Sequence, residues 1–142
     1  MRVVLDTSVL ITALRSSGGA AAENVRLALL KELTILMDYK LACEYREVAL
    51  REEHLAVSGK TQEETASLLD TLEAVAEPVL VVVRHAPLSQ DASDDMVLEV
   101  AINGSADAIV TNNTKHFREA ARRFQLQVLT PAELLNEFRK RR

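Results

Sequence analysis

The sequence is short of several residue types, and each shortage excludes a class of protein. It has one cysteine, Cys43, so no disulfide can form within the chain, which is typical of proteins kept in a reducing setting. Tryptophan is absent and aromatic residues make up only 4% of the chain, whereas hydrophobic residues make up 48%. No apolar run approaches the roughly 20 residues that cross a bilayer, and the N-terminus has no signal-peptide pattern. We therefore expect a cytoplasmic protein with an aliphatic core and no association with a membrane.

Three common catalytic arrangements are also missing. One cysteine and three scattered histidines offer no ligand spacing for zinc. No glycine-rich phosphate loop is present. Ser8 has no histidine placed to act as its base, and His116 is interpreted as a surface residue, so nucleophilic catalysis is not indicated. The remaining candidates for chemistry are acids, hydroxyls and amides.

Charge is distributed unevenly over the 142 residues, whose net charge is -4. Residues 115–142 hold eight basic and three acidic residues, whereas the preceding 114 hold nine basic and 18 acidic residues. Such a basic region is either a solvated face or a patch that steers phosphates toward an acidic pocket.

Short apolar runs alternate with segments of helical periodicity along the whole chain. This alternation predicts an α/β fold, in which a parallel sheet lies between helices on both of its faces. No linker separates two domains, so we expect one domain over residues 1–142, with residues 40–77 as a possible protruding arm. The predicted strands are 3–5, 34–37, 79–83, 108–110 and 126–129, and the predicted helices are 7–15, 20–33, 40–55, 61–77, 94–103, 114–123 and 131–140.

The first strand ends on an acid and two hydroxyl residues, Asp6, Thr7 and Ser8. In open α/β sheets, ligands bind beyond the carboxyl ends of the strands, which makes Asp6 a candidate site residue. The alternative is that Asp6 or Thr7 only caps the following helix, because Asp and Thr are preferred caps.

A second acid, Glu44, lies on an apolar stripe. Leu41, Tyr45 and Val48 are spaced i, i+4, i+7, and Glu44 occupies i+3 on the same face. An ionised carboxylate on a buried face costs several kcal/mol unless a partner neutralises it. Glu44 therefore meets a cation or a buried Arg or Lys, or it lies at the edge of the stripe and reaches water.

A third acidic cluster, Asp91, Asp94 and Asp95, precedes an apolar helix. Capping explains one of these aspartates, because acids are favoured at a helix N-terminus, but three exceed what capping needs. Glu99 adds a carboxylate one turn beyond Asp95.

Polar residues also follow the fourth predicted strand, at Thr111, Asn112 and Asn113. The carboxyl ends of strands one and four share one edge of a parallel sheet, so we expect this turn to converge with Asp6. Oxygen ligands suit Mg²⁺ or Mn²⁺. A carboxylate cage holding such ions is typical of phosphodiester hydrolysis, in which the metal acidifies water and neutralises the leaving oxygen.

Four stretches together resemble the PIN-domain ribonucleases, most closely the toxin component of VapBC-type toxin–antitoxin pairs. The resemblance covers nearly the whole chain in order. The stretches are VLDTSVL at 4–10, EYREV at 44–48, DDMVLEVA at 94–101 and ADAIVTNN at 106–113.

This resemblance implies a three-layer α/β/α fold with a central five-stranded parallel sheet. It also implies an Mg²⁺- or Mn²⁺-dependent endoribonuclease that acts as a homodimer and is inhibited by a cognate antitoxin. Carried over by position, the resemblance assigns roles to the following residues. The metal ligands are Asp6, Glu44 and Asp95, with Asp94 as the alternate third acid, and Thr7 or Ser8 and Thr111 are polar helpers. The uneven charge, and not the resemblance, supplies the candidates for contact with the RNA backbone, which are Lys115, Arg118 and Arg122.

One position departs from the family pattern. The family often has a fourth acid two residues past the threonine, where this chain has Asn113. Its carbonyl oxygen can coordinate a metal or hold water, but it brings no charge. Asp107 lies at the opposite end of its strand and does not substitute. The alternative function is therefore a catalytically weak PIN-like module that binds RNA or a protein partner. A receiver-type phospho-acceptor domain is disfavoured, because Arg84-His85 stands where the acceptor aspartate would be.

Overall fold

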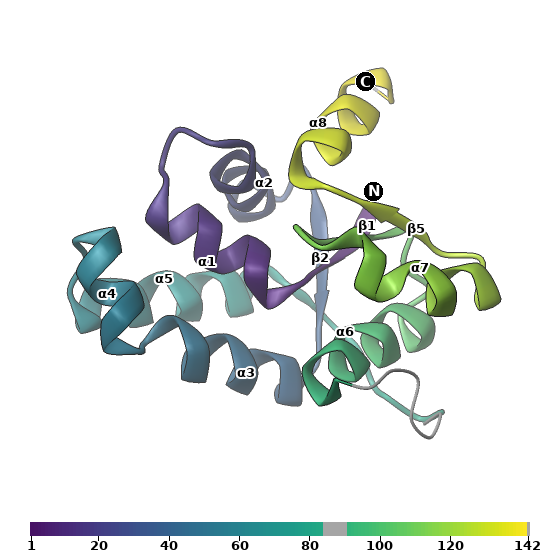
Figure 1. Ribbon diagram of the computed structural model, residues 1–142, viewed down its shortest axis with the longest axis horizontal. Coiled ribbons are helices and arrows are strands. Elements are labelled where there is room, and N and C mark those ends of the chain that lie inside the picture. The colour runs from purple at the N-terminus through teal and green to yellow at the C-terminus, as the bar shows by residue number, and fades with distance from the viewer. Residues whose placement is uncertain (84–90, 142) are drawn as a thin grey trace.

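The computed structural model describes residues 1–83 and 91–141 (Figure 1). Strands and helices alternate along most of this chain, as the hydrophobic pattern predicts. The elements are β1 (Arg2–Leu5), α1 (Thr7–Arg15), α2 (Ala20–Leu29), β2 (Thr34–Met37), α3 (Tyr39–Ala49), α4 (Glu52–Ser58), α5 (Gln62–Val75), β3 (Glu77–Pro78), α6 (Ala92–Asn103), β4 (Ala108–Val110), α7 (Thr114–Arg123), β5 (Gln127–Leu129) and α8 (Pro131–Lys140).

The five strands form one parallel sheet in the order β3-β2-β1-β4-β5, which confirms the predicted fold class. The central strand β1 is buried on both faces, and Val3, Val4 and Leu5 are at most 1% exposed. Leu5 pairs with Val110 at the carboxyl end of β4. This register places the residues that follow the two strands, Asp6 and Thr111, beside each other.

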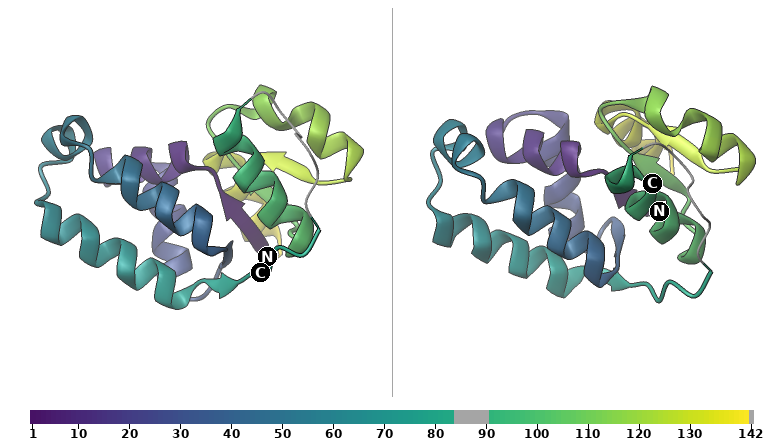
Figure 2. Two further views of the ribbon diagram at one scale, coloured as in Figure 1. Left: turned by 90° about the horizontal axis from the view of Figure 1, so that it is seen from below. Right: turned by 60° about the horizontal axis from the view of Figure 1, so that its bottom comes forward.

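Helices cover both faces of the sheet and complete the three layers. The helix α6 packs against β1, β2 and β4, whereas α2 packs against α8, which in turn contacts β5. Figures 1 and 2 show that α3, α4 and α5 extend together to one side of the strands, with α4 at the far end. No helix within residues 1–83 and 91–141 has the length and apolar content needed to cross a bilayer.

Two helices differ from their predicted bounds. The predicted helix 40–55 is two helices, because Arg51 adopts an extended conformation (φ -64°, ψ 139°) and caps the start of α4. The predicted helix 20–33 ends at Leu29, because Lys31 has a positive φ of 61° that turns the chain so that Leu33 enters the core. The single cysteine, Cys43, is exposed on α3.

The predicted strand 79–83 is wrong in its position. The paired strand β3 is Glu77–Pro78, and in 79–83 the side chains of Leu80 and Val82 are 79% and 72% exposed. The Val79 N–H still donates to the Met37 carbonyl of β2. Further along, the backbone pairs with a side chain: Val82 and Val83 donate to Asn103 Oδ1, and Asn103 Nδ2 donates to the Val83 carbonyl. The structure does not describe residues 84–90, and α6 begins at Ala92, two residues before its predicted start.

Candidate active site

Asp6 occupies the N-cap position of α1, yet its side chain does not cap the helix. Its Oδ2 atom accepts hydrogen bonds from Ser8 Oγ at 2.8 Å and from Thr111 Oγ1 at 2.7 Å. The Asp6 backbone N–H donates to the Val110 carbonyl at 2.8 Å, which continues the pairing of β1 with β4. The carboxylate is therefore held in place by two hydroxyls, the role expected of Ser8 and Thr111. Thr7 is buried and forms no hydrogen bond with Asp6.

The turn after β4 is fixed to the same place. Thr111 is fully buried, and its Oγ1 atom accepts a hydrogen bond from the Asn113 backbone N–H at 3.0 Å. Asn112 Nδ2 donates to the Ser8 carbonyl at 3.2 Å and to Thr12 Oγ1 at 2.8 Å. The predicted convergence of Asp6 with the polar turn is thus present in the structure. The hydrogen bonds of Asn112 also connect this turn to α1.

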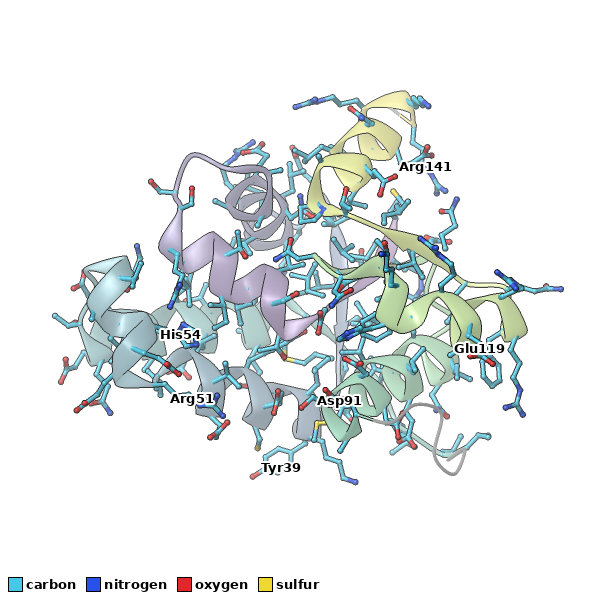
Figure 3. The ribbon with its side chains drawn as sticks, viewed as in Figure 1. Tyr39, Arg51, His54, Asp91, Glu119 and Arg141 are labelled. Atoms are coloured by element: carbon cyan, nitrogen blue, oxygen red, sulfur yellow. The ribbon has the colours of Figure 1, made fainter. Side chains whose placement is uncertain are left out.

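The three aspartates at the start of α6 have different surroundings. Asp91 is the cap, and its side chain accepts from the Ser93 backbone N–H at 2.8 Å (Figure 3 labels it). Asp94, in the first turn of the helix, is only 8% exposed. Burial, aided by the negative charges of Asp91 and Asp6, raises the pKa of Asp94 to about 6, and the nearby His116 opposes this shift. The negative charge of Asp6 therefore contributes to the raised pKa of Asp94.

Both candidates for the third acid lie in the first turn of α6. Asp94 is buried and Asp95 is half-buried. Asp94 contacts α7 through His116, and the charge of Asp6 contributes to the raised pKa of Asp94. Spacing alone could not separate the two, because the choice depends on where α6 begins.

Glu44 is half-buried on α3, beside the fully packed Tyr45. Tyr45 donates from its hydroxyl to the Leu5 carbonyl at 2.5 Å, which anchors α3 to the end of β1. Burial, together with the charges of Asp6, Asp38 and Glu44, raises the pKa of the Tyr45 phenol. Glu44 forms no salt bridge or hydrogen bond within the described chain, so the buried Arg or Lys considered above is not its partner.

His116 was missed as a site residue. Its side chain is 53% exposed, as expected of a surface histidine, but Nδ1 lies 3.4 Å from Asp94 Oδ2. Its Nε2 atom lies 2.9 Å from Asn113 Nδ2. The spacing of Asn113 and His116, three residues apart at the start of a helix, is the only sequence signal for this contact.

The donor set at this edge of the sheet consists of carboxylate, amide and hydroxyl oxygens, which fits a hard cation such as Mg²⁺ or Mn²⁺. Asp6 is near enough to raise the pKa of Asp94, and a cation between the two carboxylates would offset their repulsion. Within residues 1–83 and 91–141, no three His, Cys, Asp or Glu side chains are gathered closely enough to form a metal cage. Glu44, the second predicted acid, is half-buried on α3.

Three basic residues of α7 lie near the polar turn that follows β4. Lys115, Arg118 and Arg122 are exposed, and Arg118 and Arg122 are one helical turn apart. The two arginines line a pocket of about 340 Å³ that opens between α7, β5 and α8. Thr114, the residue after Asn113, lines the same pocket, so the basic face adjoins the polar turn.

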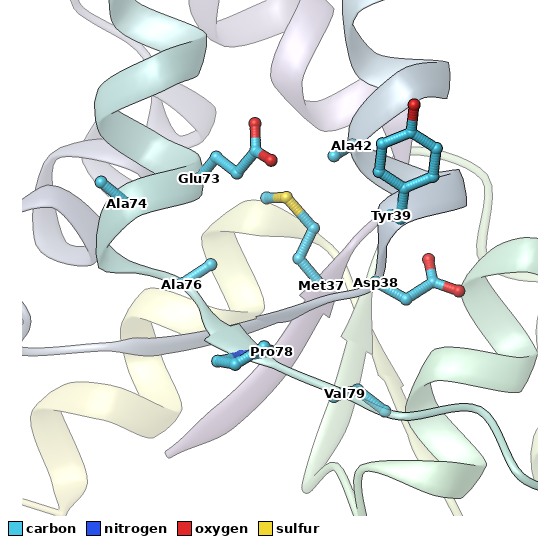
Figure 4. A pocket seen from close by; sticks show the side chains of 9 residues that line it. All are labelled: Met37, Asp38, Tyr39, Ala42, Glu73, Ala74, Ala76, Pro78 and Val79. Carbon is cyan, nitrogen blue, oxygen red and sulfur yellow. The ribbon is translucent and has the colours of Figure 1, made fainter.

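Another pocket, of about 400 Å³, lies between β2, α3, α5 and β3 (Figure 4). It contains Asp38 and Glu73, but none of the predicted site residues. Asp38 is the cap of α3, since its Oδ1 atom accepts from the Leu41 backbone N–H at 2.8 Å. This pocket is therefore separate from the acidic site.

The fold and site together define an α/β protein with an acidic site at the carboxyl ends of its central parallel strands. The PIN domain family matches residues 2–115, and the chain belongs to that family. Members of the family are generally nucleases. No match was found among curated proteins. A similar solved structure is that of VapBC2 from Rickettsia felis bound to a DNA fragment from their promoter. It has a TM-score of 0.58 and 20% identity, over 92% of this chain and 98% of that chain.

Proposed function

We propose that residues 1–142 act as a single-domain, metal-dependent endoribonuclease. The observation that carries the proposal is the approach of Asp94, in the first turn of α6, to Asp6 at the carboxyl end of β1, in a chain of the PIN domain family. Asp6 and Asp94 repel each other when both are ionised, so their proximity destabilises the folded protein. Such unfavourable arrangements of charge are typical of functional sites.

Asp6 and Asp94 would hold Mg²⁺ or Mn²⁺, with Glu44, Asp95 and Asn113 as further oxygen donors or as acceptors for bound water. The cation supplies charge neutralisation at the phosphate and lowers the pKa of a water molecule. Ser8 and Thr111 fix one oxygen of Asp6 and leave the other oxygen available.

The basic face of α7 would bind the RNA backbone. Lys115, Arg118 and Arg122 are exposed beside the polar turn, and guanidinium groups match phosphate geometry with two parallel hydrogen bonds. Replacing Arg118 and Arg122 with glutamine is expected to raise KM and to weaken the salt dependence of binding, with kcat little changed.

We further propose that the chain is the toxin of a toxin–antitoxin pair, acting in the cytoplasm as a homodimer. Its support is the VapBC-like sequence pattern together with the matching fold of the VapBC2 structure. Expression of the chain in growing bacterial cells is expected to arrest growth, and expression of Asp6→Asn is not. Mass measurement of the purified protein in solution tests the dimer.

The proposed activity is tested by incubating the chain with mixed RNA in Mg²⁺, Mn²⁺ or EDTA. We expect cleavage with either metal, none in EDTA, and a loss of at least about 100-fold in Asp6→Asn and Asp94→Asn. The matched control is Asp107→Asn, which removes an aspartate from the far end of β4. Cleavage by Asp6→Asn at the wild-type rate would overturn the assignment of the site.

A second candidate function is supported by Asn113. An amide at this position provides an oxygen without a charge, which lowers the charge available to hold a second cation. The chain would then be a binding module for RNA or a protein. That function predicts RNA binding that survives in the combined Asp6→Asn and Asp94→Asn variant, with no cleavage by the wild type in either metal.

A further inference from the structure

Asn113 lies between the two acids and is connected to each of them. Its backbone N–H donates to Thr111 Oγ1 at 3.0 Å, and Thr111 donates to Asp6. Its side-chain nitrogen Nδ2 lies 2.9 Å from His116 Nε2, and the other ring nitrogen of His116 lies 3.4 Å from Asp94. The backbone of Asn113 is thus connected to Asp6 through Thr111, and its side chain is connected to Asp94 through His116.

These contacts determine which way round the Asn113 amide is held. The 2.9 Å contact joins the amide nitrogen Nδ2 of Asn113 to Nε2 of His116, and because an amide NH₂ group only donates, Nε2 is the acceptor. The other ring nitrogen, Nδ1, faces the Asp94 carboxylate. The amide oxygen Oδ1 therefore points away from His116, and it forms no hydrogen bond with the described residues.

We propose that His116 is a positioning residue that keeps the Asn113 carbonyl oxygen, and not its NH₂ group, available at the acidic site. The inference rests on the proposed metal-dependent function. A carboxylate at position 113 would present an oxygen whichever way it turned. An asparagine presents either an oxygen or an NH₂ group, and an NH₂ group cannot bind a cation. His116 thus supplies the orientation that the change from acid to amide requires.

Three variants separate this role from a structural one. His116→Ala removes both ring contacts. His116→Gln restores them, since its amide NH₂ can donate to Asp94 while its carbonyl accepts from Asn113. Asn113→Asp removes the need for orientation. Glu119→Ala, an exposed acid on the same helix, is the control for general effects on α7 (Figure 3).

The first measurement is the NMR signal of the Asn113 side-chain NH₂ in the metal-free protein, at about pH 8, where an ordinary histidine is neutral. We expect a hydrogen-bonded proton that exchanges slowly with water in the wild type and in His116→Gln. In His116→Ala the exchange becomes that of a free amide. The NH₂ group of Asn112, which bonds Ser8 and Thr12, is the internal control and does not change.

The second measurement is Mn²⁺ affinity by calorimetry. His116→Ala is expected to weaken binding about tenfold, the lower end of the effect of residues that orient metal ligands. In the Asn113→Asp background the same change should weaken binding less than about twofold. His116→Gln should bind Mn²⁺ as the wild type does.

Two results would overturn the proposal: an Asn113 NH₂ signal that is unaffected in His116→Ala, or an equal loss of Mn²⁺ affinity in both backgrounds. Failure of the wild type to bind Mn²⁺ at all would instead contradict the proposed function. The NMR comparison needs no metal, so it still decides whether His116 orients Asn113.

Discussion

Replacing Asp94 with asparagine is expected to stabilise the metal-free protein, although the same change removes a proposed metal ligand. Asp94 is 8% exposed, and burial together with Asp91 and Asp6 raises its pKa from 3.8 to about 6. The folded protein therefore holds this proton more tightly than the unfolded chain does. Converted to free energy, the difference in pKa makes the ionised carboxylate cost about 3 kcal/mol of folding stability.

The cost depends on pH in a defined direction. Below about pH 4 the carboxyl is protonated in both states, and Asp94 costs nothing by ionising. As the pH rises through the interval between 3.8 and about 6, the unfolded chain loses the proton first, so the wild type loses stability. Above about pH 7 the loss is complete. An asparagine does not titrate, so the advantage of Asp94→Asn should grow over the same interval.

Thermal denaturation in EDTA, followed by circular dichroism at several pH values, measures this advantage. At about pH 8 the melting temperature of Asp94→Asn should exceed that of the wild type by about 9 °C, taking about 3 °C for each kcal/mol. Asp95→Asn is the matched control, and its gain should be smaller because Asp95 is half-buried. Equal stability of Asp94→Asn and wild type at pH 8, or a gain that is the same at pH 4, would refute the reasoning.

Three further changes test individual contacts. Thr111→Val removes the hydrogen bond to Asp6 and should lower the free energy of unfolding by about 1.5–3 kcal/mol, measured by urea denaturation. Tyr45→Phe leaves the buried Leu5 carbonyl without its donor and should cost about 1–3 kcal/mol in the same assay, with a smaller effect on Mn²⁺ affinity than on stability. Val82→Ser should change stability by less than about 0.5 kcal/mol, because the side chain is exposed; a loss above about 1.5 kcal/mol would mean that residues 79–83 are a buried strand.

The centre of the fold and part of the site could be predicted from the sequence because they depend on local patterns. A short apolar run that ends on an acid indicates a buried strand, and the parallel arrangement then brings Asp6 to Thr111. The run at 79–83 has the same apolar pattern as β1 but lies past the end of the edge strand β3. Nothing in its composition shows that Asn103 pairs with its backbone.

The contacts that the sequence left open concern distances between elements. The choice between Asp94 and Asp95 depends on the rotation of α6, which is set by its packing against β1 and β4. His116 was missed because its partner Asp94 is on another helix. A sequence pattern reports neighbours along a helix or strand, whereas these contacts depend on the angle between two helices.

The hydroxyls on either side of Asp6 have a consequence for the entropy of ligand binding. Because Ser8 and Thr111 both hold Oδ2, the carboxylate has already lost its rotational freedom when the chain folds. A ligand that arrives at Oδ1 then immobilises nothing new in this side chain, so more of its interaction energy appears as affinity. The conformational entropy of the Asp6 side chain is therefore lost when the chain folds and not when a ligand binds.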